Sequence, residues 1–154
     1  MVKVTCSQLC EIAMALEACD VIFICVIQND QEMLIPEGFE ARIEAKGKWL
    51  IIKGWVPQVL ILDHKSVCGF LTHCGWNSLF EGVSSGVAMV AWSVMAKQFY
   101  NAKLVTDVLQ IGVSIGDVEW SATSTCDGVK REEIERAVAR VMDVEDGEDM
   151  RMRA

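Results

Sequence analysis

The chain has 154 residues, enough for one domain with a buried core. Hydrophobic residues make up 52% of the sequence, which argues against a disordered chain. The net charge of -8 argues against a nucleic-acid partner, because phosphate backbones are bound by clustered Lys and Arg. A small anionic ligand stays open, because a single helix N-terminus can hold a phosphate locally.

The first predicted elements are a helix and a strand. One helical face carries the apolar residues between Leu9 and Leu16, and Thr5 with Gln8 predicts a capping box at the start of this helix. The continuous apolar run Val21–Ile27 predicts a strand buried on both faces, as in a parallel sheet. A polar stretch with a turn at Pro36–Gly38 follows.

Strands and helices then alternate to the end of the chain. Shorter apolar runs predict strands at 49–52, 68–72, 88–92 and 112–115. Helices are predicted at 76–85, at 97–109 with Leu104, Val105 and Val108 inward, and at 130–142 with Ile134, Ala137, Val138 and Val141 inward. The charged tail from Asp143 is predicted to fray. The alternation predicts an α/β fold, a Rossmann-like parallel sheet with flanking helices.

Seven cysteines are present, and no two form a Cys-x-x-Cys pair, so the ligand spacing of a zinc site is missing. We expect buried, reduced thiols in a reducing compartment. The apolar runs are too short to span a bilayer, and no signal peptide opens the chain. The expectation is a cytoplasmic protein without a metal ion or a membrane span.

Three polar segments follow predicted strands, at 55–58, 73–78 and 96–98. Ligands of open α/β sheets bind beyond the carboxyl ends of the strands, so the three segments are candidates for one site. Each has a simpler explanation. Trp55 could be a loop aromatic that covers the core, His73 a structural histidine, and Ser78 with Glu81 a capping box. The third segment could be an ordinary helix start.

The 44 residues from Trp55 to Gln98 resemble the signature box of plant secondary-product UDP-glycosyltransferases. Two runs carry most of the resemblance, Trp-x-Pro-Gln-Val-Leu-Ile-Leu-x-His at 55–64 and Gly-Phe-Leu-Thr-His-Cys-Gly-Trp-Asn-Ser at 69–78. The box continues with Glu81-Gly82, Gly86-Val87 and Gln98-Phe99. Similar segments outside the box extend the resemblance to nearly the whole chain from Gln8 onward.

This resemblance implies that residues 1–154 are the partial C-terminal, UDP-sugar-binding domain of a GT-B glycosyltransferase. The implied reaction transfers a sugar, by resemblance glucose, to a hydroxyl group of a small lipophilic plant metabolite with inversion and without a metal ion. The family's catalytic base lies in an N-terminal acceptor domain that we expect to be absent, so the chain alone is expected to be inactive. We also expect truncation at both ends, with a missing central strand that leaves a sheet edge exposed.

The resemblance assigns roles within the box. Trp55 is implied to stack on uracil, the backbone at Val56 to bond the base edge, Gln58 to support the nucleoside and Glu81 to accept both ribose hydroxyls. The diphosphate is expected at the helix opening, where amides and the helix dipole face an anion. The residues expected to bind the UDP-sugar are Trp55, Val56, Gln58, His73, Gly75, Trp76, Asn77, Ser78, Glu81, Lys97 and Gln98.

Lys97 departs from the family pattern. The family has Asp or Glu there, which accepts hydrogen bonds from sugar hydroxyls, whereas an ammonium group can only donate. We therefore expect weaker discrimination among UDP-sugars. The alternative function is a non-catalytic, truncated UDP-binding module or a degenerate pseudo-glycosyltransferase. A Rossmann dehydrogenase and a P-loop enzyme are set aside, because neither glycine motif occurs.

Overall fold

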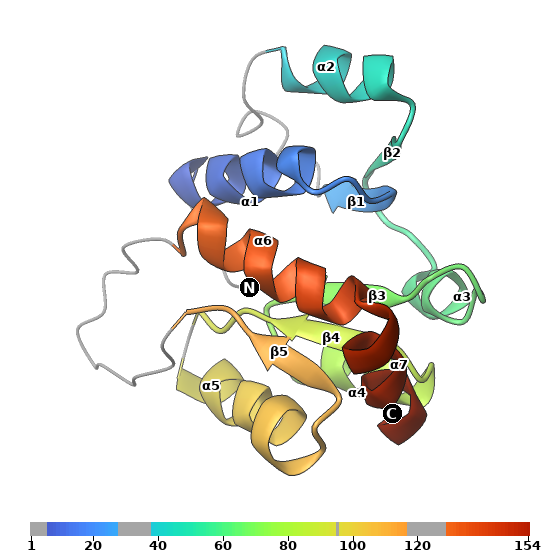
Figure 1. Ribbon diagram of the computed structural model, residues 1–154, viewed down its shortest axis with the longest axis vertical. Helices are drawn as coiled ribbons and strands as arrows, with labels where there is room; N and C mark the ends of the chain where they lie inside the picture. Colours follow the sequence, from blue (N-terminus) through green and yellow to red (C-terminus); the bar gives the residue numbers. More distant parts are fainter. Residues whose placement is uncertain (1–5, 28–37, 95, 117–128) are drawn as a thin grey trace.

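The computed structural model describes residues 6–27, 38–94, 96–116 and 129–154, in which helices alternate with strands (Figure 1). The helices are α1 Cys6–Ala18, α2 Phe39–Lys46, α3 Gln58–Leu62, α4 Trp76–Ser84, α5 Ala96–Lys103, α6 Arg131–Met142 and α7 Val144–Arg153, with a π-helical turn, η2, at Leu104–Val108. The strands are β1 Phe23–Ile27, β2 Trp49–Lys53, β3 Gly69–Thr72, β4 Ala88–Ala91 and β5 Gly112–Ser114. The α/β class and all five predicted strands are confirmed.

The strands pair in parallel, as expected, but they form two sheets within the described segments. The three-stranded sheet has the order β3-β4-β5, with Gly69 opposite Ala88 and Met89 opposite Gly112. The two-stranded sheet pairs β1 with β2. The single sheet expected from the sequence is thus divided into two parallel parts.

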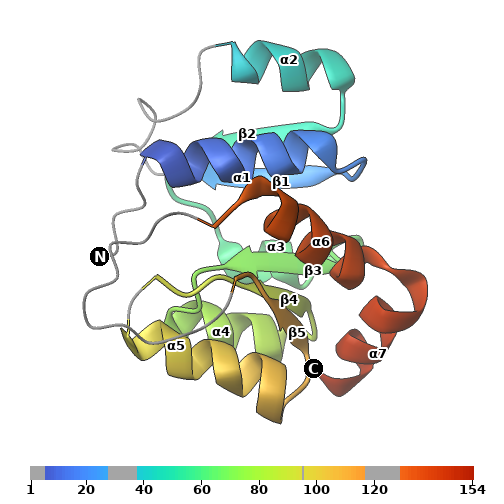
Figure 2. The same ribbon diagram turned by 60° about the vertical axis from the view of Figure 1, so that its left-hand side comes forward.

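The three-stranded sheet is the middle layer of a three-layer core. Its central strand, β4, is buried along its whole length. Successive side chains of a strand point to opposite faces, so Val90 packs with α1 and α6 while Met89 packs with α4 and η2. Figure 2 shows α6 on one side of this sheet and α4 with α5 on the other. Each buried apolar side chain contributes roughly 1.5–3 kcal/mol, and this drives the layering.

Helix α1 contacts both sheets. Leu16 belongs to the core above the three-stranded sheet, whereas Ala13 packs with Phe39 and Trp49 beside the two-stranded one. Trp49 is held edge-to-face against Phe39, with ring centroids 5.6 Å apart. The aromatic contacts fix α2, whose exposed and charged sequence showed no apolar periodicity and gave no prediction of a helix.

The prediction that the first strand is buried on both faces is wrong. In β1 the side chains of Ile24 and Val26 are 45% and 43% exposed, and Ile22 just before the strand is 80% exposed. Phe23 and Trp49 point to the face covered by α1 and α2. Ile24 and Val26 point to the opposite face, and no described helix packs against that face. The apolar run is therefore covered on one face only.

The charged tail is also not frayed. It forms α7, because the Asp143 carboxylate caps the helix by accepting hydrogen bonds from the amides of Glu145 and Asp146 at 2.9 and 3.0 Å. Met150 is buried against the main core, and the helix turns back onto α6. The charged sequence of this segment gave no sign that Met150 packs into the core.

The helix predicted at 97–109 ends differently from expectation. Leu104 and Val105 pack into the core, but Val108 is 70% exposed. The amide of Leu109 donates to the carbonyl of Leu104, which makes a five-residue π turn. This wider turn rotates Val108 away from the face that a regular helix would give it.

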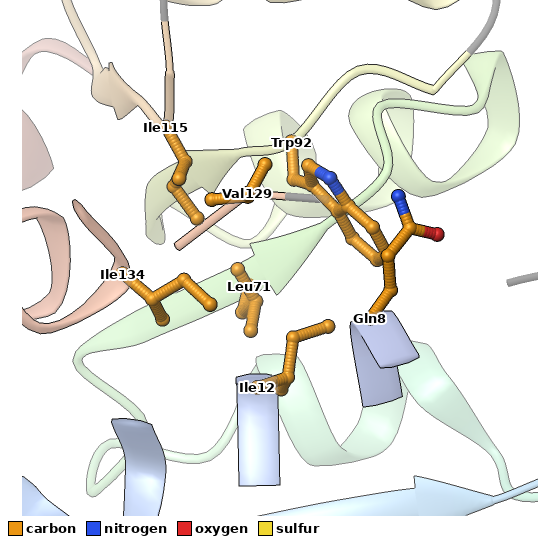
Figure 3. A pocket seen from close by; sticks show the side chains of 7 residues that line it. All are labelled: Gln8, Ile12, Leu71, Trp92, Ile115, Val129 and Ile134. Atoms are coloured by element: carbon orange, nitrogen blue, oxygen red, sulfur yellow. The ribbon is translucent and has the colours of Figure 1, made fainter. Parts of the chain in front are cut away.

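The space between α1 and the three-stranded sheet is closed by side chains. Figure 3 shows Gln8 and Ile12 of α1 facing Leu71 and Trp92 across this space. The remaining cavity has no room for a water molecule, and most of its lining is apolar. It is a packing gap of the core and not a ligand site. Thr5, the predicted capping partner of Gln8, lies outside the described residues, so that cap stays a prediction.

No helix within the described segments is long and apolar enough to cross a membrane.

We expect Gly147→Ala to lower the free energy of unfolding by about 1–3 kcal/mol. A Cβ atom at Gly147 would lie 2.2 Å from the carbonyl oxygen of Val141, so α7 would have to move away from α6. Urea denaturation measures the change. Glu148→Ala, on the exposed side of the same helix, is the matched control. A Gly147→Ala protein as stable as this control would contradict the packing of α7.

Candidate functional site

The carboxyl ends of β3 and β4 meet at one edge of the three-stranded sheet. Thr72 lies opposite Ala91, and the amide of Trp92 donates to the carbonyl of Thr72 at 2.9 Å. The segment after β3 and the segment after β4 therefore leave the sheet side by side. Helix α3, which begins with Gln58 after β2, and helix α5, which follows β4, both contact α4.

The first segment joins the second through one hydrogen bond. Nε2 of Gln58, at the start of α3, donates to Oε2 of Glu81 in α4 at 2.7 Å. This contact fixes a carboxylate next to the loop that carries Trp55. The indole of Trp55 is 87% exposed, so it does not cover the core. That simpler explanation of Trp55 is wrong, and its ring face is open for stacking.

Helix α4 begins without a side-chain cap. Gly75 is its N-cap residue and makes no side-chain cap bond, and the first intrahelical bond runs from the amide of Leu79 to the carbonyl of Gly75. The amides of residues 76–78 therefore have no intrahelical acceptor. Ser78 is the third residue of the helix, so the capping box suggested for Ser78 and Glu81 is wrong, because the helix starts two residues earlier.

The turn before α4 is strained. Cys74 has a φ of 56°, in the left-handed region that costs a residue with a side chain roughly 1–3 kcal/mol. Its amide donates to Oγ1 of Thr72 at 3.2 Å, and its carbonyl accepts from Nδ2 of Asn101 at 2.9 Å. Sequence reasoning assigned no role to Thr72 or Asn101. Asn101 lies three residues after the end of the box, in the part of the chain over which the resemblance extends.

His73 lies over the start of this turn. A Cβ atom at Gly75 would be 3.1 Å from Nε2 of His73, so the missing side chain leaves room for the imidazole. The side chain is still exposed to solvent. Partial burial nevertheless lowers the pKa of His73. The ring is therefore neutral at pH 7, with one N–H group able to donate to an anion.

The third segment begins α5. Lys97 is exposed, whereas Gln98 is buried, and Oε1 of Gln98 accepts a hydrogen bond from the amide of Val94 at 2.9 Å. This bond closes the loop between β4 and α5. The expected contacts of Lys97 and Gln98 with a sugar, and of the Val56 backbone with a base, stay predictions.

The cysteines whose side chains the structure describes are free thiols. Cys74 is buried, and burial raises its pKa to about 11, so its thiol is uncharged and unreactive at neutral pH. Cys10, Cys19, Cys25 and Cys68 are half-buried, so full burial is confirmed for Cys74 only. Within the described parts of the chain, no three His, Cys, Asp or Glu side chains gather as a metal site.

We expect His73→Gln to reduce the loss of stability between pH 7 and pH 5. Because the pKa of His73 is lowered in the folded state, the unfolded chain binds a proton there more readily below about pH 6.5. Stability from neutral His73 is thus present above that pH and is lost as the pH falls through the folded-state pKa. Urea denaturation at both pH values, with His64→Gln as matched control, tests this. Equal losses in wild type and His73→Gln would contradict it.

A family profile described as "UDP-glucoronosyl and UDP-glucosyl transferase" matches residues 1–143. Among curated proteins, the chain is 55% identical to UDP-glucosyl transferase 73M2 of Saponaria officinalis, over 96% of this chain and 30% of the relative. It is 54% identical to the scopoletin glucosyltransferase of Nicotiana tabacum, over 97% of this chain and 31% of that protein. The chain thus spans about a third of the length of these relatives.

Solved structures share the fold. The Medicago truncatula enzyme UGT71G1, complexed with UDP-glucose, matches with a TM-score of 0.81 and 34% identity over 98% of this chain and 33% of that one. Phytolacca americana UGT2, complexed with UDP-2fluoro-glucose and pterostilbene, matches with a TM-score of 0.82 and 33% identity over 97% and 32%. These neighbours have the GT-B fold. With the profile covering most of its length and relatives more than half identical to it, the chain belongs to the UDP-glucoronosyl and UDP-glucosyl transferase family.

Proposed function

We propose that residues 1–154 are the donor-binding domain of a UDP-glycosyltransferase that transfers glucose from UDP-glucose to a hydroxyl group of a small plant metabolite, with inversion. The observation that carries the proposal is the Gln58–Glu81 hydrogen bond, which joins two segments of the signature box next to the uncapped start of α4. The transfer belongs to a longer protein, in which an N-terminal domain supplies the acceptor pocket and the base.

The nucleoside occupies the loop after β2. The exposed indole of Trp55 stacks on the uracil, a contact that contributes about 1–3 kcal/mol and does not by itself select the base. The backbone at Val56 bonds the base edge and gives the preference for uracil. Glu81 accepts hydrogen bonds from both ribose hydroxyls, and Gln58 holds the Glu81 carboxylate in place for them.

The diphosphate lies at the start of α4. The amides of residues 76–78 donate to its oxygens, and the positive end of the helix dipole favours its charge. His73, neutral at pH 7, adds a further donor. As the bond to the anomeric carbon breaks, negative charge grows on the departing UDP. Donors already fixed there lower the barrier, and we propose that they act without a metal ion.

The names of similar proteins support a small-molecule acceptor. They include a scopoletin glucosyltransferase, an anthocyanin 3'-O-beta-glucosyltransferase of Gentiana triflora, and the Phytolacca americana structure that holds pterostilbene. The identity of the acceptor depends on the part of the protein outside this chain. The cytoplasmic location expected from the sequence stays a prediction.

A second candidate is a UDP-binding module that does not transfer sugar. Lys97 favours it, because this exposed ammonium stands where the family accepts hydrogen bonds from the sugar. Fusion of a related N-terminal domain to the chain separates the two candidates. Turnover of UDP-glucose by the fusion supports a competent donor half, and UDP binding without turnover supports the second candidate.

We expect the purified chain to bind UDP, and Glu81→Gln and Trp55→Ala to weaken the binding. Loss of base stacking in Trp55→Ala should cost about 1–3 kcal/mol, which is roughly five- to 150-fold in Kd. Glu81→Gln keeps the shape of the side chain and removes the charge that receives the ribose hydroxyls. Isothermal titration calorimetry measures the affinities.

Glu148→Gln, on the exposed side of α7, is the matched control and should bind UDP as wild type does. Circular dichroism establishes that each protein is folded. A folded wild-type chain that binds no UDP would overturn the proposed function. Equal affinities of wild type and Glu81→Gln would remove Glu81 from the site.

We expect Lys97→Glu to sharpen the choice between UDP-glucose and UDP-galactose. The two donors differ only in the direction of one sugar hydroxyl, and a carboxylate can accept from that hydroxyl where an ammonium group cannot. Titration of wild type and variant with both donors and with UDP gives the ratios. An unchanged ratio of the two donor affinities would show that Lys97 does not contact the sugar.

A further inference from the structure

The turn between β3 and α4 is held by groups outside α4. The carbonyl oxygen of Cys74 accepts a 2.9 Å hydrogen bond from Nδ2 of Asn101, which lies 27 residues later in α5. On the other side of the residue, the amide of Cys74 donates to Oγ1 of Thr72. The Cys74 side chain packs in a small buried cluster with Ala91 of β4 and Ala102 of α5. The polar and apolar contacts together fix a left-handed conformation that the residue would not adopt alone.

The hydrogen bond from Asn101 controls the direction of the next amide. A peptide unit is planar and trans, so the carbonyl of Cys74 and the N–H of Gly75 point in opposite directions. With the carbonyl directed at Asn101, the N–H of Gly75 is directed away from α5. Rotation of this peptide would also rotate the chain as it enters α4. The orientation of the first turn of α4 thus depends on a side chain of another helix.

We propose that Asn101 is a positioning residue for diphosphate binding, which holds the Cys74 carbonyl and thereby aims the free amides at the start of α4. This inference rests on the proposed function, since it requires UDP at that helix end. Asn101 does not need to contact the ligand. Trp55 and Glu81, assigned to the base and the ribose, lie outside the turn, so Asn101 acts on the phosphates and not on the nucleoside.

The same helix also bears on the sugar. Lys97 and Asn101 are four residues apart and lie on one face of α5. Lys97 is assigned to the sugar end of the donor, whereas Asn101 holds the turn at the phosphate end. A single rigid helix therefore sets the distance between the two parts of the donor site.

The test compares UDP with uridine, which lacks the phosphates, as ligands of the full chain. NMR titration gives both affinities for wild type, Asn101→Leu and Asn101→Ala. The two variants lose the same donor and disturb the packing in opposite ways, because Leu fills the space and Ala leaves it empty. Thr106→Val is the matched control. Its hydroxyl bonds to Ala102 and Asp107 in the same helical unit and not to Cys74.

Both Asn101 variants should bind UDP about tenfold more weakly, with the affinity for uridine changed by less than about twofold. Thr106→Val should keep the wild-type ratio of the two affinities. If the Asn101 variants keep the wild-type ratio of UDP affinity to uridine affinity, the inference is overturned. Equal losses for both ligands are one such result. A folded wild-type chain that binds neither ligand would overturn the proposed function as well. If the wild-type chain binds UDP and the Asn101 variants bind it with the same affinity, this inference alone is overturned.

Discussion

The parallel pairing of β3 with β4 is the constraint on which the rest of the site depends. Parallel strands require a crossover connection between them, and here it contains α4, the helix whose start we assign to the diphosphate. The pairing also brings the end of β3 beside the end of β4, so that the turn at Cys74 meets the start of α5. Every residue of β4 is buried, so this pairing lies at the centre of the core.

The second constraint is the connection between the two sheets near the site. The β1–β2 sheet shares α1 with the main core, and beyond β2 the chain reaches α4 through α3. The hydrogen bond between Gln58 and Glu81 spans this junction. A shift of one sheet against the other would therefore change the distance between the nucleoside and the phosphate parts of the proposed site. A half-buried hydrogen bond to a carboxylate is stronger than a bond between neutral groups, which suits it to this role.

One strained residue, Cys74, lies where we assign ligand chemistry. Cys74 and Gln110 are the non-glycine residues with positive φ within the described segments, and Cys74 directly precedes the helix N-cap. Its conformation is maintained by contacts from β3, β4 and α5, and its thiol stays protonated because it is buried. The neighbouring His73 is kept neutral for a similar reason, since partial burial disfavours its charged form. The diphosphate site that we propose thus consists of neutral donors and a helix dipole, rather than of clustered cations.

The sequence by itself determined the α/β class, the five strands, the inward face of α6 and the family, because local apolar periodicity and the spacing of the box are properties of neighbouring residues. The tertiary structure decided the rest. It showed that β1 is covered on one face only, since the number of helices against a strand is not encoded in the strand. It made α7 a packed helix through Met150 and a capping Asp143. Contacts between Asn101 and Cys74, or Gln58 and Glu81, join residues far apart in the chain. No local pattern specifies such pairs, because they exist only after the strands have been brought into register.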